Sequence, residues 1–179
     1  MIKGNFSPTV ALLMFEQAGF RVARLGVEQL LLEVKALDQK HYASLQLPLR
    51  LRRLPDLLVA DRALSFVRMV EVKFRQNVRE VRTSLREDLG ELRAIWPQVY
   101  VLLLVAESPH GPDAQNLQDF VRVIPPDLDL ALVFGNRAPA RDDLLWDELL
   151  RLSKAFPGFD EAAADLGRIT TSIKSLSAA

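Results

Sequence analysis

The chain has 179 residues, of which 49% are hydrophobic and 26% are charged, and it contains no cysteine. This composition is typical of one globular domain with a substantial core, and the absence of cysteine excludes disulfides, thiolate nucleophiles and zinc–thiolate sites. Its 23 basic and 23 acidic residues cancel, so it lacks the strong basic excess of most dedicated nucleic-acid binders.

Hydrophobic periodicity and turn residues predict the order helix, three strands, helix, strand, followed by further helices and one more strand. The expected helices cover residues 8–18, 78–95, 113–122, 142–155 and 159–174. The expected strands cover residues 20–25, 54–60, 64–74, 99–106 and 129–134. This order predicts an α/β fold with a central mixed sheet flanked by helices. We expect a single domain over residues 1–179, with a core over residues 8–106 and a C-terminal extension over residues 107–174.

Charge is distributed unevenly along the chain. Residues 48–93 contain eleven basic and seven acidic side chains, whereas residues 94–179 contain seven basic and twelve acidic ones. The local basic excess permits contact with a polyanion without requiring it. The N-terminal residues lack the pattern of a signal peptide, and no apolar stretch is long enough to span a bilayer. We therefore expect a cytoplasmic protein that does not enter the membrane.

Two short segments on consecutive expected strands contain the residues with the most direct chemical meaning. Asp56 follows Pro55 at the start of one strand, and Glu71 and Lys73 lie on one face of the next, because side chains alternate along a strand. A carboxylate and an ammonium on an otherwise apolar strand are costly unless they are paired, hydrated or bound to a metal. A hairpin through residues 61–62 would bring Asp56 alongside Glu71.

This arrangement suits a divalent cation. Two neighbouring carboxylates repel each other, and a cation bound between them relieves that repulsion. Mg²⁺ prefers oxygen ligands and keeps several waters, so two acids, a backbone carbonyl and a substrate phosphate would suffice, and Mn²⁺ can substitute. Such a cation activates a bound water, and Lys73 could orient that water. A purely structural ion pair between Glu71 and Lys73 is the other interpretation.

The half-motifs are common, but their combination is not. The Pro-Asp dipeptide occurs at residues 55–56, 112–113 and 126–127. The acid-x-lysine pattern occurs at residues 33–35, 38–40 and 71–73. Only the first Pro-Asp precedes an acid-x-lysine, and only the last acid-x-lysine lies in a clear strand pattern.

With these residues in this order, the segment resembles the PD-(D/E)xK nuclease superfamily, which has the restriction-endonuclease-like fold. The resemblance covers residues 8–106, whose predicted order matches the helix, three strands, helix and strand of that core. It implies that Asp56, Glu71 and the carbonyl of Val72 hold Mg²⁺. It also implies that Lys73 acts on the attacking water.

The resemblance further implies a glutamate on the first helix near the metal, a place that Glu16 occupies in this sequence. A solvated helix position is an equally good interpretation of Glu16. Arg75, Gln76, Arg79 and Arg82 follow the motif, and they are candidates for contacts with nucleic-acid phosphates. A solvated face paired with acidic neighbours is the alternative for the arginines.

These interpretations predict a Mg²⁺-dependent endonuclease that hydrolyses DNA phosphodiester bonds, with Asp56, Glu71, Lys73 and Glu16 as the catalytic residues. The alternative is a non-catalytic interaction or assembly module with the same fold. The neutral net charge and the acidic, leucine-rich C-terminal segments favour that alternative. A homodimer is compatible with the nuclease, because cutting two strands needs two sites.

Overall fold

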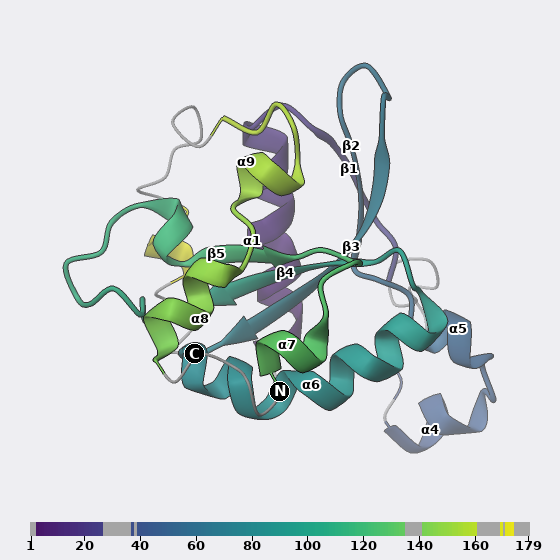
Figure 1. The fold of residues 1–179 in the computed structure, drawn as a ribbon. Coiled ribbons are helices and arrows are strands. Elements are labelled where there is room, and N and C mark those ends of the chain that lie inside the picture. The colour runs from purple at the N-terminus through teal and green to yellow at the C-terminus, as the bar shows by residue number, and fades with distance from the viewer. Residues whose placement is uncertain are drawn as a thin grey trace.

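A computed structural model describes residues 3–26, 37, 39–134, 141–160, 169 and 171–173. At its centre is a mixed sheet with the strand order β1-β2-β3-β4-β5 (Figure 1). The strands are β1 (Arg21–Arg24), β2 (Leu57–Ala60), β3 (Val67–Arg75), β4 (Tyr100–Val105) and β5 (Val121–Ile124). The pair β3–β4 is parallel, and the other three pairs are antiparallel. The expected α/β fold with a mixed sheet is confirmed.

Helices cover both faces of this sheet (Figure 1). On one face α1 (Lys3–Gln17) and α9 (Leu152–Ala155) pack against β2, β3, β4 and β5. On the other face α6 (Val78–Ile95), α7 (Leu130–Phe134) and α8 (Asp142–Glu148) pack against β4 and β5. Two short helices, α4 (Gln39–Ser44) and α5 (Leu49–Arg52), and the 3-10 turn η1 (Leu117–Asp119) complete the described elements.

The longest helix, α6, has the bounds that its sequence pattern predicts. Its side chains at apolar helical spacing are buried, namely Val78, Val81, Leu85, Leu89 and Leu92. Its first turn is capped by the side chain of Asn77, which accepts a hydrogen bond from the amide of Glu80. The helix ends directly before Trp96 and Pro97, since proline cannot continue a helix. This helix fixes the crossover from β3 to β4.

The hairpin between β2 and β3 is tied by Asp61. Its carboxylate accepts hydrogen bonds from the amide and the hydroxyl of Ser65, at 2.7 and 2.6 Å. The Ser65 hydroxyl is the main reason why the pKa of Asp61 lies below its ordinary value. Because β2 is short, it pairs only with residues 67–70 of β3. Residues 71–75 therefore continue past the end of β2, and among the described residues no other strand pairs with them on that side.

Three expectations beyond residue 106 are wrong in detail. The helix expected at 113–122 is a single 3-10 turn followed by β5, because the β-branched residues Val121, Val123 and Ile124 complete the sheet beside β4. The strand expected at 129–134 is the short helix α7. An apolar run of this length does not distinguish a strand from a buried helix.

The third correction concerns the single helix expected at 142–155, which is broken between α8 and α9. Leu150 leaves the helical path and forms a β-bridge with Val123, with hydrogen bonds of 2.9 and 3.0 Å between their amides and carbonyls. The helix expected at 159–174 lies largely outside the described residues, although Ile169 and residues 171–173 are helical. Within the described part of the chain, no helix is both long enough and apolar enough to cross a membrane.

Candidate functional site

The hairpin brings the two halves of the motif together. The register pairs Leu57 with Val70, so Asp56 comes opposite Glu71 at the point where β2 begins. The Asp56 carboxylate accepts a hydrogen bond of 2.8 Å from the amide of Val72. The Lys73 ammonium lies 2.8 Å from the Glu71 carboxylate. We call Asp56, Glu71 and Lys73 the acid–lysine cluster.

The alternation of β3 places the charged side chains of this cluster on one face. Val70 and Val72 point into the core beneath α1, whereas Glu71 and Lys73 point to the face that α6 covers. The Glu71 and Lys73 side chains are 14% and 23% exposed. Charges this far removed from water need partners. Their mutual ion pair supplies one, and the open space beside them leaves room for others.

Two hollows adjoin at the cluster. The larger, which we call the site cavity, has a volume of about 580 Å³, and residues from α1, β3 and the start of α6 line it together with Asp56. The smaller has a volume of about 240 Å³ and is bordered by Arg52, Arg53 and Asp88. Asp56, Glu71 and Lys73 line both hollows. An extended ligand that runs from one hollow to the other would therefore pass all three side chains.

The backbone of β3 adds an oxygen to this site. The amide and carbonyl of one strand residue point to the same side, so the Val72 carbonyl points toward the end of β2, as its amide does. Continuing the register places Pro55 opposite Val72. Proline has no N–H to donate to that carbonyl. Pro55 therefore cannot donate to the Val72 carbonyl, and Val72 is among the residues that line the site cavity.

This set of donors fits a hard cation. Asp56, Glu71 and the Val72 carbonyl offer oxygen atoms only, which is the ligand type that Mg²⁺ and Mn²⁺ prefer. Among the described residues, no group of three or more histidine, cysteine, aspartate or glutamate side chains is arranged to hold a metal ion. The cluster, together with Val72, offers a cation two carboxylates and one backbone carbonyl.

Glu16 does not lie with the cluster. It is exposed near the C-terminal end of α1, and neither hollow is lined by it. The residue of α1 that does line the site cavity is Ser7, which is 4% exposed. Ser7 and Glu16 are nine positions apart along the helix, which corresponds to about 13 Å along its axis. The role of Glu16 stays a prediction that has no geometric support from the two hollows.

Sequence reasoning missed Ser7 because Ser7-Pro8 has the form of a helix start. In the structure α1 begins earlier, at Lys3, and Pro8 lies inside it. A signal was nevertheless present. Ser7 precedes the buried residues Val10 and Ala11 by three and four positions, so it continues the buried face of the helix.

Arg75 and Gln76 line the site cavity, but other protein groups hold their side chains. The Arg75 guanidinium donates to the Ser84 hydroxyl at 2.7 Å and to the Phe74 carbonyl at 2.8 Å, and it pairs with Asp88 at 3.6 Å. The Gln76 side-chain amide donates to the Glu107 carboxylate at 2.8 Å. Both residues therefore contribute to the wall of the cavity in defined positions.

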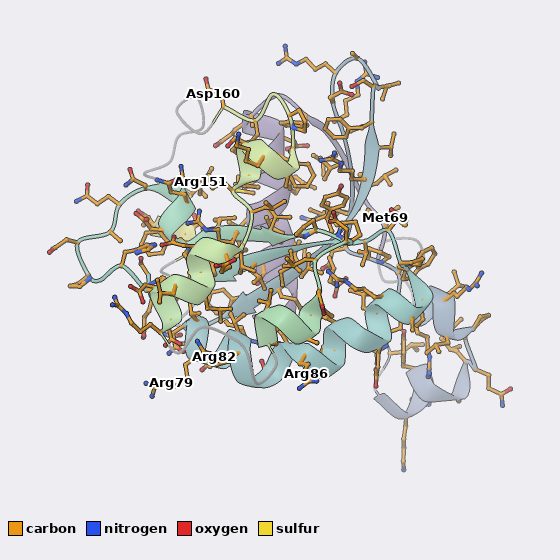
Figure 2. All side chains as sticks on the ribbon, in the orientation of Figure 1. Met69, Arg79, Arg82, Arg86, Arg151 and Asp160 are labelled. Carbon is orange, nitrogen blue, oxygen red and sulfur yellow. The ribbon has the colours of Figure 1, made fainter. Side chains whose placement is uncertain are left out.

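The arginines further along α6 do not line the site cavity. Arg79 and Arg86 are exposed, and Figure 2 shows both on the outer side of α6, directed away from the sheet. Arg82 is half-buried and pairs with Asp142 of α8 at 3.4 Å. Of the proposed nucleic-acid contacts, Arg75 and Gln76 are thus beside the cluster, and Arg79 and Arg82 are on a neighbouring surface.

Comparisons with known proteins leave the interpretation to this geometry: no family model matches the chain, and no curated protein or solved structure matches it.

Proposed function

We propose that the protein is a Mg²⁺-dependent endonuclease of the PD-(D/E)xK type, with the restriction-endonuclease-like fold, that hydrolyses DNA phosphodiester bonds. The observation that supports it most is the convergence of Asp56, Glu71 and Lys73 at the common border of two hollows. Two carboxylates and a lysine beside open space form a set that can hold a cation and a water next to a phosphate.

In this proposal Asp56, Glu71 and the Val72 carbonyl hold the cation. When bound, it lowers the pKa of a water and offsets negative charge at the phosphorus atom. Lys73 donates hydrogen bonds to the attacking water oxygen and to the charge that develops on the phosphate. The ion pair with Glu71 keeps the ammonium in position. The water oxygen would form a new bond to phosphorus as the bond to the leaving sugar oxygen breaks, while the attacking water loses a proton to solvent and the leaving oxygen takes one up from a water molecule.

A nucleic acid, and DNA in particular, is the proposed substrate. The cluster lies within residues 48–93, a segment in which eleven basic side chains outnumber seven acidic ones. Arg52 and Arg53 border the smaller hollow, and Arg79 and Arg86 are exposed on α6. Cations spread along a surface in this way suit a chain of phosphates. The proposal includes a cytoplasmic location and a homodimer, which would place two sites on the two strands of a duplex.

Cleavage assays test this function directly. Plasmid, single-stranded DNA, branched DNA and RNA are incubated with the protein and Mg²⁺, with chelation of the metal as one control. We expect cleavage of at least one DNA substrate, lost on chelation and reduced at least about a hundredfold in Asp56→Ala and Lys73→Ala. Lys154→Ala, at an exposed position on α9, is the matched control that should retain activity. Equal activity in all variants would reject the proposed site.

A specific observation favours the second candidate, a non-catalytic interaction or assembly module. The cluster already has partners within the protein, because Glu71 and Lys73 pair with each other and Asp56 binds the Val72 amide. If that is its role, Mg²⁺ and Mn²⁺ will neither bind nor raise the melting temperature. The Asp56→Ala protein will then lose stability without any effect that depends on metal.

A further inference from the structure

One buried polar group in the site cavity is not used by the proposed chemistry. The Ser7 residue is 4% exposed and lines the cavity from α1. Its side chain ends in a hydroxyl, which can donate one hydrogen bond to a ligand in that cavity. In a wall that also contains several carboxylates, a hydroxyl is a neutral donor suited to an anion.

The open edge of β3 offers a second donor to the same cavity. Phe74 lies two residues after Val72, so its amide also points to the side where β2 has ended. The Val72 amide binds Asp56, and the Phe74 carbonyl accepts a hydrogen bond from Arg75. In the described part of the chain, β2 pairs with β3 only as far as Val70, so the Phe74 amide lies beyond that ladder. Phe74 and Ser7 both line the site cavity, and each residue has a neutral group that can donate a hydrogen bond.

We propose that the Ser7 hydroxyl and the Phe74 amide bind the non-bridging oxygens of the substrate phosphate. This assignment rests on the proposed nuclease function, because it takes the substrate to be a phosphodiester held beside the cluster. Phosphate oxygens are strong acceptors and match hydroxyl and amide donors. The donors hold the phosphate at the α1 side of the cavity, and Lys73 acts from the cluster.

The charges around the cavity make this binding dependent on a cation. Its lining contains three carboxylates, Asp56, Glu71 and Glu80, and two cations, Lys73 and Arg75, so the carboxylates are in excess and weaken the binding of an anion. A divalent cation offsets that excess, and we therefore expect it to strengthen phosphate binding. Ser7 contributes to phosphate affinity and not to cation affinity, which separates its role from those of Asp56 and Glu71.

Two titrations of Ser7→Ala test the proposal. The first measures Mn²⁺ binding by calorimetry, where we expect a dissociation constant within about twofold of the wild type. The second measures binding of a labelled DNA oligonucleotide with Ca²⁺ in place of Mg²⁺. There we expect a loss of about tenfold, the size of one hydrogen bond to a charged group. Ser153→Ala, at an exposed position on α9, is the matched control.

The outcomes are distinct. Weaker Mn²⁺ binding in Ser7→Ala would assign the hydroxyl to the metal and overturn the proposal, and unchanged binding of both ligands would make Ser7 structural. A wild-type protein that binds no Mn²⁺ would remove the proposed function itself. Melting curves check that Ser7→Ala folds, and the amide resonance of Phe74 gives a readout without mutation. The chemical shift of that amide should change when the oligonucleotide is added to the protein with its bound cation. An unchanged chemical shift would contradict the assignment.

Discussion

Two cations lie in one row of the sheet, yet their surroundings differ. The register pairs Lys73 of β3 with Leu103 of β4, and Leu103 with Arg122 of β5, so both side chains point to the face covered by α6–α8. Lys73 is 23% exposed beside the site cavity. Arg122 is only 3% exposed and lies beneath α8. The same row thus contains one cation next to open space and one within the packed core.

Their hydrogen bonds show what this difference means. Arg122 donates to the Trp146 carbonyl at 3.0 Å and to the Asp147 carboxylate at 3.1 Å, and its guanidinium lies over the Trp146 ring. Burial lowers the pKa of Arg122, and Asp147 partly opposes that effect. Fixed protein groups hold Arg122 on several sides, as expected for a structural charge. The ion pair formed by Lys73 leaves its ammonium able to reach a ligand.

The largest expected effect is on stability, and it separates these two cations. Arg122→Ala should lower the free energy of unfolding by about 3 kcal/mol, because it removes buried hydrogen bonds and packing at Trp146. Lys73→Ala should lower it less, by about 1 kcal/mol, because Glu71 loses its ion-pair partner but still borders a hollow that water can enter. Urea denaturation of both variants gives the two values. Equal losses would mean that Lys73 is as structural as Arg122.

A smaller effect is expected for the residue that ends the β2–β3 ladder. Pro55→Ala supplies an N–H opposite the Val72 carbonyl and should weaken Mn²⁺ binding about tenfold by competing for that oxygen. Pro112→Ala is the matched control, since it precedes Asp113 in an exposed turn. Calorimetric titration of the three proteins measures the change. Identical affinities would show that the Val72 carbonyl does not hold the cation.

The smallest effect is expected on the outer surface of α6. Arg79→Ala should weaken DNA binding only about twofold to fivefold, and it should reduce the dependence of binding on salt, because one phosphate contact is lost. Arg75→Ala should have the larger effect, since Arg75 lines the site cavity. Anisotropy titrations at several salt concentrations compare them. A larger loss of DNA affinity for Arg79→Ala than for Arg75→Ala would indicate that DNA binds along the outer surface of α6 and not at the cavity.

Within residues 8–106, the first helix, the three strands, α6 and β4 were predictable because their local signals agree with their tertiary environment, whereas the short helices α4 and α5 were not predicted. The buried face of α6 repeats at helical spacing, and the polar turn at Asp61 separates two apolar strands. The Asp56–Glu71 neighbourhood followed from that hairpin. The predictions failed where short apolar runs, such as residues 130–134, fit a strand and a helix equally. Such a run is decided by which neighbour completes the sheet, and that information is not local.

The lack of non-local information also explains which site residues could be predicted and which could not. Alternation along β3 placed Glu71 and Lys73 on one face from sequence alone. It could not indicate that Ser7 and not Glu16 reaches the cavity, because that depends on how α1 is oriented over the sheet. The partners of Arg75 and Gln76 were equally hidden, since Ser84 and Glu107 approach them only in the folded chain.

The bridge between Leu150 and Val123 has a consequence for self-association. Exposed sheet edges are where separate molecules join strand to strand, the first step toward fibrous aggregates. Leu150 occupies both backbone groups of Val123 on the outer side of β5. A second molecule can add a strand at Val123 only after the hydrogen bonds between Val123 and Leu150 have broken. The bridge therefore hinders strand-to-strand association at this point of β5.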